Sequence, residues 1–190
     1  LMLEFRSNLT PAMIYSALES TAIDMGTAGF DNDSGYGLID VEAAISSLVI
    51  PPGAPTNVMA IFGNQQANVS WNAPADNGGD TVTGYTVMST PGGVTATSTA
   101  TSTTVTGLTN GVDYTFTVAA ENSAGTGASS TASTAVTPAT VPDAPTSVVA
   151  EAGIGAATVA WNAPASDGGR PISTYLITSS PGGLTASTTG

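Results

Sequence analysis

Apolar residues occupy every second position in several short runs of this chain. Three of these runs cover residues 58–62, 67–71 and 114–118. Side chains two positions apart lie on the same face of a strand, so this period predicts β-strands with one buried face. Turn-forming residues separate the runs, as in Asn77-Gly78-Gly79, Pro91-Gly92-Gly93 and Asn110-Gly111. The pattern therefore predicts a mainly β protein with tight turns.

The first 50 residues follow a helical period instead. Small and apolar residues recur at intervals of three and four from Ile14 to Ala22, which places them on one stripe of a helix. Thr10 suits the N-cap, Pro11 the first helical position and Gly26 the stop. These signals predict a helix at about 11–23.

A second, shorter helix is predicted at about 40–48. Asp40 is a suitable N-cap, and Pro51 ends the segment. Its apolar face consists of Val41, Ala44, Ile45 and Leu48. Both predicted helices present mostly small side chains, which fit closely against a larger body. About 50 residues alone bury too little surface to form such a body.

The chain contains two copies of one repeat. The first copy begins at Gly53 and the second at Asp143, and they align without a gap at an offset of 90 residues. Matching pairs are Pro55 and Pro145, Trp71 and Trp161, and Tyr85 and Tyr175. A repeat of this length suits one small β-sandwich. Residues 143–190 correspond to only the N-terminal half of that sandwich, so we expect 53–139 alone to fold autonomously.

Charge limits the classes of partner. The net charge is −12, with Arg6 and Arg170 as the two basic residues and no lysine. Such a surface repels phosphate backbones and anionic lipid headgroups, so neither nucleic-acid nor membrane-surface binding is expected. No apolar run approaches the roughly 18 residues of a membrane span. The chain has no cysteine, which excludes disulfides and thiolate sites without fixing the compartment.

The absence of histidine limits the chemistry further. A Ser-His-Asp triad and a histidine-ligated zinc are excluded within these residues. The acidic residues are scattered singly, which does not suit a pair of catalytic carboxylates. We accordingly predict no catalytic, cofactor-binding or metal-binding residue in this chain.

Several aspartates precede glycines, a pattern found both in calcium-binding loops and in ordinary turns. Asp31 and Asp33 stand before Gly35, as carboxylates do at the opening of a calcium loop. A third oxygen ligand and a closing glutamate are missing, and Asp is also an ordinary turn residue. A turn is the favoured interpretation, and bound calcium is the alternative. Beside the Gly-Gly turns, Asp76, Asp80 and Asp167 are interpreted as solvated turn acids.

The first copy carries several marks together: Pro55, the Trp71 strand ending in NAP, NGG before Tyr85, and GLTNGVDYTFTVAAENSAG. The run from Pro55 to Pro138 thereby resembles a fibronectin type III module. Its composition, rich in Thr and without Lys, is similar to that of modules in bacterial exported enzymes. The resemblance implies an immunoglobulin-like β-sandwich. It also implies a tyrosine corner, in which the Tyr114 hydroxyl bonds to upstream backbone. We expect Trp71, Tyr85, Leu108 and Tyr114 to be core residues and not ligand contacts.

The N-terminal segment carries a second resemblance. Its marks are Leu9-Thr10-Pro11, Ala17-Leu18, Thr21-Ala22 and Gly35-Tyr36-Gly37-Leu38-Ile39-Asp40. They resemble the C-terminal end of a subtilisin-like (S8 family) serine protease domain. Residues 1–50 are then expected to be a two-helix remnant of an α/β domain. The resemblance places the family's catalytic Asp, His and Ser, and its oxyanion Asn, upstream of Leu1.

Together the two resemblances imply three parts: a protease remnant at 1–50, a complete module at 53–139 and half a module at 143–190. The expected function is that of a C-terminal fragment of an exported subtilisin-like serine endopeptidase, with the modules as spacers or accessory domains. The fragment itself is expected to be non-catalytic, free of cofactors, monomeric, and extracellular or at the cell surface. Its partner would be the parent enzyme's protein or polysaccharide substrate.

Two alternatives remain open. One is a non-enzymatic cell-surface adhesion or binding protein, and the other is an exported polysaccharide-degrading enzyme, because both classes also carry these modules. The sequence upstream of Leu1 would separate them from the protease.

Overall fold

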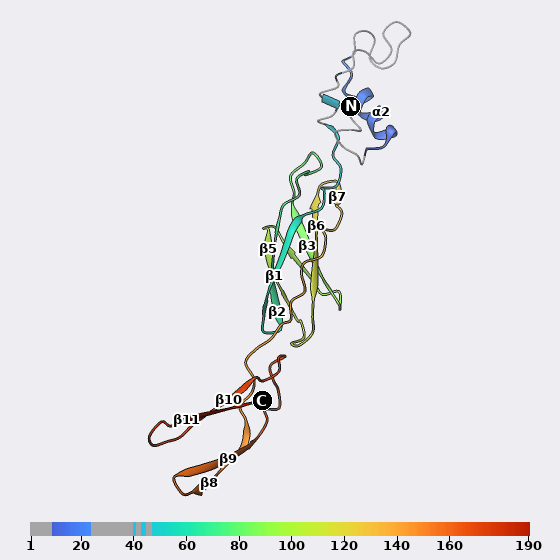
Figure 1. Ribbon diagram of the computed structural model, residues 1–190. Helices are drawn as coiled ribbons and strands as arrows, with labels where there is room; N and C mark the ends of the chain where they lie inside the picture. The colour runs from blue at the N-terminus through green and yellow to red at the C-terminus, as the bar shows by residue number, and fades with distance from the viewer. Residues whose placement is uncertain (1–8, 24–39, 41–42, 45–46) are drawn as a thin grey trace.

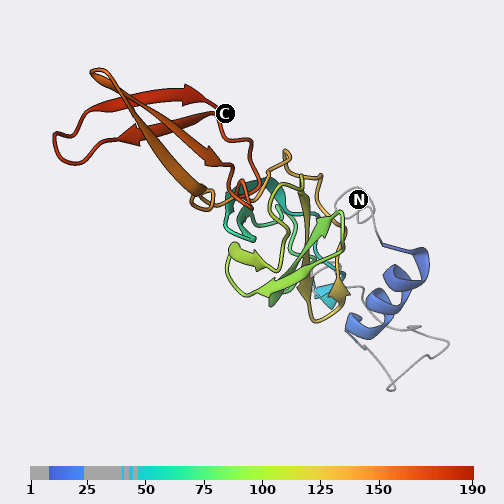
Figure 2. The ribbon, with the colours of Figure 1, turned by 90° about the horizontal axis from the view of Figure 1, so that it is seen from below.

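A computed structural model describes residues 9–23, 40, 43–44 and 47–190 (Figure 1). The described parts follow one another along an elongated molecule. Helix α2 (Pro11–Thr21) lies near one end, a β-sandwich forms the middle and two β-hairpins form the other end (Figures 1 and 2).

The first copy of the repeat forms a sandwich of two antiparallel sheets. The three-stranded sheet has the order β1-β2-β5, with β1 at Thr56–Gly63, β2 at Gln66–Asn72 and β5 at Ser102–Thr106. The four-stranded sheet has the order β4-β3-β6-β7, with β4 at Thr95–Ser98, β3 at Gly84–Thr90, β6 at Thr115–Asn122 and β7 at Gly125–Thr126. The alternating pattern predicted the mainly β structure, and the resemblance implied the immunoglobulin-like sandwich; both expectations are confirmed.

The inner faces of both sheets bury the residues that the period-two pattern selected. Along β2, buried and exposed positions alternate strictly, with Ala67, Val69 and Trp71 inward. The core also contains Tyr85, Val87, Val105, Leu108, Tyr114, Phe116, Val118 and Ala120. The predicted core roles of Trp71, Tyr85, Leu108 and Tyr114 are confirmed. Phe62 differs from the pattern: it is the second-last residue of β1, and 43% of its surface is exposed.

The second copy forms two separate hairpins. Strand β8 (Thr146–Gly153) pairs with β9 (Ala156–Asn162), and β10 (Thr174–Thr178) pairs with β11 (Thr185–Thr189). The register of β8 with β9 repeats that of β1 with β2, including the irregularity near its start. The rings of Trp161 and Tyr175 lie 5.2 Å apart, the same separation as those of Trp71 and Tyr85. Identical local geometry thus forms in both copies.

Helix α2 begins as the sequence predicted. The Thr10 side chain accepts a hydrogen bond from the Met13 N–H (3.3 Å), and Pro11 is the first helical residue. The helix ends at Thr21, two residues before the predicted end, and Ala22 is already extended. The Thr21 hydroxyl donates to the carbonyl of Ala17 (2.7 Å), which satisfies an end-of-helix acceptor without a further turn. Gly26, the predicted stop, lies outside the described residues.

The predicted second helix is described only in part. The Asp40 carboxylate accepts a hydrogen bond from the Ala43 N–H (2.9 Å), as expected of an N-cap. Ala43, Ala44 and Ser47 are helical. A small core joins the two segments and consists of Leu9, Ala17, Ala44, Leu48 and Ile50. Among the described residues, no helix is long and apolar enough to cross a membrane.

Candidate functional site

Tyr114 forms the predicted corner. Its hydroxyl accepts a hydrogen bond from the Thr109 N–H at 3.1 Å. Its backbone forms a two-way pair with Val136, through bonds of 2.9 Å in each direction. The ring is buried in the sandwich core. Tyr114 therefore fastens the chain before β6 to the loop after β5, which is a structural role.

Trp71 lies in the same core, with 4% of its surface exposed. Its ring meets that of Tyr85 edge to face, at an interplanar angle of 61°. The indole Nε1 is buried and has no hydrogen-bond partner among the described residues. Neither aromatic ring offers a face to a ligand, so both stabilise the module by apolar burial.

The aspartates beside the Gly-Gly turns organise those turns. The Asp76 carboxylate accepts from the Gly78 N–H and the Asp167 carboxylate from the Gly169 N–H, both at 2.9 Å. A hydrogen bond from the Ser123 side chain, and next one from the Thr81 backbone, lower the pKa of Asp80 below its usual value. These contacts agree with the predicted role as turn acids.

Metal-binding chemistry finds no support in the described part of the chain. No group of three or more acidic residues there comes close enough together to hold an ion. Asp31 and Asp33 lie outside the described residues, so the choice between a turn and a calcium loop stays a prediction.

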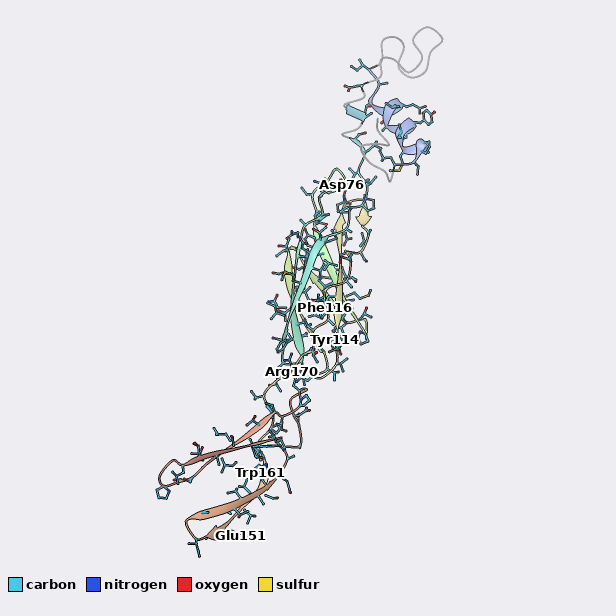
Figure 3. All side chains as sticks on the ribbon, viewed as in Figure 1. Asp76, Tyr114, Phe116, Glu151, Trp161 and Arg170 are labelled. Carbon is cyan, nitrogen blue, oxygen red and sulfur yellow. The ribbon has the colours of Figure 1, made fainter. Side chains whose placement is uncertain are left out.

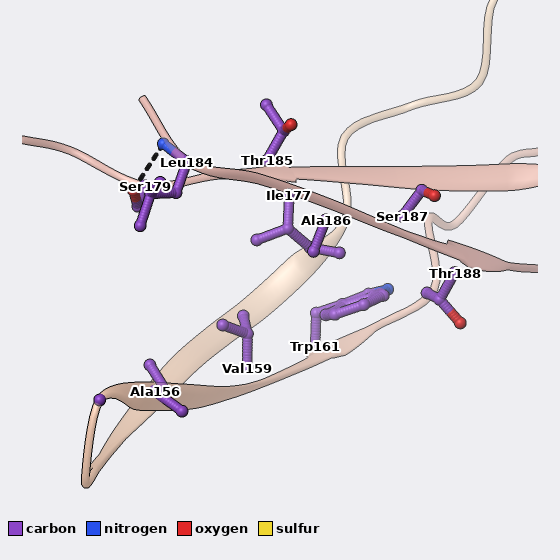
Figure 4. A pocket seen from close by; sticks show the side chains of 12 residues that line it. Ala156, Val159, Trp161, Ile177, Ser179, Leu184, Thr185, Ala186, Ser187 and Thr188 are labelled. Atoms are coloured by element: carbon purple, nitrogen blue, oxygen red, sulfur yellow. Dashed lines mark hydrogen bonds between the residues drawn. The ribbon is translucent and has the colours of Figure 1, made fainter. Parts of the chain in front are cut away.

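An open groove lies between the two hairpins of the second copy (Figure 4). Val159, Trp161, Ile177 and Leu184 line it, and Leu184 is 77% exposed. At the offset of 90 residues these four correspond to Val69, Trp71, Val87 and Val94, which belong to the first copy's core or pack against it. The groove is thus the inner face of a sandwich, chemically equivalent to a core.

A set of contacts that the sequence did not reveal ties each linker to the module that follows. In the first copy, the Ile50 N–H donates to the carbonyl of Gly78 (2.9 Å) and the Gly53 N–H to that of Asp76 (2.8 Å). At the equivalent positions of the second copy, the Thr140 N–H donates to Gly168 and the Asp143 N–H to Ser166. We call this pair of bonds the linker clip. The signal available in the sequence was the recurrence of a Gly-Gly turn at the same offset from each linker.

Asn122, at the end of β6, completes the first linker clip. Its side-chain amide donates to the carbonyls of Ile50 (2.7 Å) and Asn77 (2.9 Å), and its side-chain oxygen accepts from the Ala124 N–H. The side chain is buried. One amide thus joins the linker, the Gly-Gly turn and the hairpin that follows β6.

The comparisons with known proteins agree with this architecture. Residues 53–136 match the family model of the fibronectin type III domain. This part of the chain is therefore a fibronectin type III module, with the tyrosine corner and the two-sheet core described above.

Solved structures resemble slightly less than half of the chain. Domains A168–A170 of titin share 28% identity at a TM-score of 0.43, and the alignment covers 46% of this chain and 32% of the titin chain. The twitchin kinase region from C. elegans shares 32% identity at a TM-score of 0.43, covering 46% of this chain and 17% of that one. The chain thus spans less than a third of the length of either protein.

Proposed function

We propose that this chain is a non-catalytic accessory segment of an exported subtilisin-like serine endopeptidase. Its fibronectin type III module acts as a spacer that sets the distance between the catalytic domain and the parts of the protein that follow the module. The observation that carries the accessory role is that the module's distinctive residues serve its own fold. The aromatic residues Trp71, Tyr85 and Tyr114 are buried in the core, and the turn acids and Asn122 bond to local backbone.

Such a module contributes by position and not by chemistry. A folded unit between two functional domains sets their separation and therefore their effective concentration at a shared substrate. The linker clip and Asn122 support this role, because they tie the chain that enters the module to the module itself.

The protease parent rests on the N-terminal segment. Thr10 caps a helix that begins at Pro11, and the Asp40 carboxylate caps the segment that follows. A pair of helices at these positions supports the proposed resemblance to the end of a subtilisin-like domain. Ala17 and Ala44 are buried in a small core with Leu9, Leu48 and Ile50. Small contact residues such as these two alanines allow close packing against a larger catalytic body.

Two measurements test the proposal. The purified chain, incubated with casein and with a fluorophosphonate probe, should show neither cleavage nor labelled serine, because a triad needs a histidine that this chain lacks. The reading frame before Leu1 should encode a Gly-Thr-Ser-hydrophobic-Ala segment that carries the nucleophile. Specific labelling of the chain would overturn the non-catalytic role, and an upstream frame without that segment would overturn the protease parent.

A further inference from the structure

The two copies of the repeat meet at a specific contact beside their linker. The guanidinium carbon of Arg170, in the second copy, lies 4.3 Å from the centre of the Phe62 ring in the first. Arg170 lies at the junction between the sandwich and the hairpins (Figure 3). A cation over an aromatic face is attracted by the ring's quadrupole. The Phe62 side chain, near the end of β1, is partly exposed and therefore accessible to this contact.

Two glycines bring the copies to van der Waals distance next to this stack. A Cβ atom added to Gly169 would lie 2.5 Å from the Gly111 nitrogen and 2.8 Å from the Asn110 Cβ. A Cβ atom added to Gly111 would lie 3.3 Å from the Cα of Gly169. Real side chains do not approach backbone as closely as the first two distances, so the Gly-Gly turn of the second copy fits this loop only because residue 169 has no side chain.

The linker is anchored to the same loops. The Gly111 N–H donates to the carbonyl of Pro138 (2.9 Å), and the Ala139 N–H donates to that of Gly63 (3.2 Å). The next residue, Thr140, enters the linker clip of the second copy. The chain between the copies is thus bonded first to one copy and then to the other, which leaves little free length between them.

The Gly-Gly turn of the first copy has a different residue at the position that corresponds to Arg170. Residue 80 corresponds to Arg170 and is an aspartate, whose carboxylate accepts a hydrogen bond from the Thr81 N–H (2.6 Å). A carboxylate above an aromatic face is repelled by the quadrupole that attracts a guanidinium. The turn at residues 77–80 would therefore not stack on Phe62.

We propose that Phe62, Asn110 and Gly111 form a docking surface for the Gly-Gly-Arg turn of the module that follows, and that Arg170 fixes the orientation of the second copy on the first. The partner that fits this surface is a fibronectin type III module with Gly-Gly-Arg in that turn. A module with Gly-Gly-Asp in this turn, like the first copy itself, does not dock there. The residue after the two glycines therefore determines which copy can follow the other. The proposal depends on these contacts alone and not on the protease parent.

The distance between two spin labels tests this docking. The chain has no cysteine, so Ser102→Cys and Ala165→Cys place single labels on exposed positions of β5 and of the segment before the second copy's turn. Pulsed electron paramagnetic resonance should give one narrow distance. Arg170→Asp, Arg170→Gln and Phe62→Leu should each replace it by a broad distribution, and combining Arg170→Gln with Phe62→Leu should add no further broadening. The matched control is Asp80→Asn, which neutralises the equivalent position in the first copy and should leave the narrow distance unchanged.

A longer chain, in which the second copy is completed, tests the docking without the open groove between the hairpins. Gly190 corresponds to Ala100, so residues 101–138 appended after Gly190 continue the second copy in register. They supply counterparts of the residues that cover the first core, among them Val105, Phe116 and Val118. A narrow distance in the extended chain, lost on Arg170→Gln, supports docking even if the 190-residue chain gives a broad one. A broad distribution in the extended chain without substitutions, or a narrow one that survives both Arg170→Gln and Phe62→Leu, would overturn the proposal.

Discussion

Trp71 and Trp161 occupy the same place in the two copies and make the same contact with a tyrosine, yet their burial differs. Trp71 lies in the closed core of the sandwich. Trp161 lines the open groove and is only partly buried. The free energy that an aromatic side chain contributes depends on the apolar area it removes from water, so the two tryptophans should contribute very differently to stability.

Trp71→Ala should therefore unfold residues 53–139 or nearly so. Truncation of a large core aromatic costs about 3–5 kcal/mol, a large share of the ~5–15 kcal/mol that stabilises an ordinary domain. Circular dichroism against temperature measures the effect. Trp161→Ala is the matched control and should leave the main transition of the chain in place. A melting temperature of Trp71→Ala within a few degrees of the unsubstituted chain would show that the residue does not hold the core.

The linker between helix and sandwich behaves as part of the module. Its residues Ile50 and Gly53 donate backbone hydrogen bonds to carbonyls of the Gly-Gly turn, and the Asn122 side-chain amide, at the end of β6, donates to the Ile50 carbonyl. Asn122 lies 45 positions after Asn77 in that turn. The element that closes this end of the sandwich is therefore a three-way junction of linker, turn and strand end.

Asn122→Ala should destabilise this end of the sandwich. The substitution removes the donor from the buried carbonyl of Ile50, and an unsatisfied buried polar group costs about 1–3 kcal/mol. Urea denaturation followed by tryptophan fluorescence gives the change in the free energy of unfolding. Asn68→Ala, on the exposed face of β2, serves as control and should change it by less than about 0.5 kcal/mol. Equal effects of the two substitutions would contradict the role of Asn122.

Over the length of the molecule, the two copies share their local geometry but differ in how many strands pair and how many side chains are buried. Strand β2 is paired on both edges, by β1 and β5, and its inward side chains are covered by the second sheet. Strand β9 pairs with β8 alone, and no position along it is fully buried. Exposed apolar faces and unpaired strand edges provide little protection against local opening.

Amide hydrogen exchange should reveal this difference directly. The amides of β2 are expected to exchange slowly, at the rate of global unfolding, and those of β9 to exchange faster by local opening. The comparison is internal, because each amide of β9 has a counterpart in β2 at the offset of 90 residues. Equal protection around Trp161 and Trp71 at low protein concentration would show that the second copy is closed in solution.

The sequence by itself determined the strands, the cap of α2 and the first module's core. Period-two alternation selected Val69, Trp71 and Phe116 as inward residues, because strand geometry alone sends every second side chain to the same face. The resemblance to fibronectin type III modules located the Tyr114 corner, and local N-cap chemistry located Thr10 and Asp40. All of these depend on residues close together in the chain or on a motif of fixed spacing.

Only the tertiary structure decided which loops meet at the ends of the sandwich. The bond from Asn122 to Ile50 joins residues 72 positions apart, and the stack of Arg170 on Phe62 joins two copies of the repeat. No period or motif encodes such pairs, because strand order and strand length determine which loops arrive at the same end. For the same reason the alternation that predicted a buried Phe62 was wrong there: the pattern fixes the face of a residue, whereas its burial depends on whether the opposite sheet reaches that far.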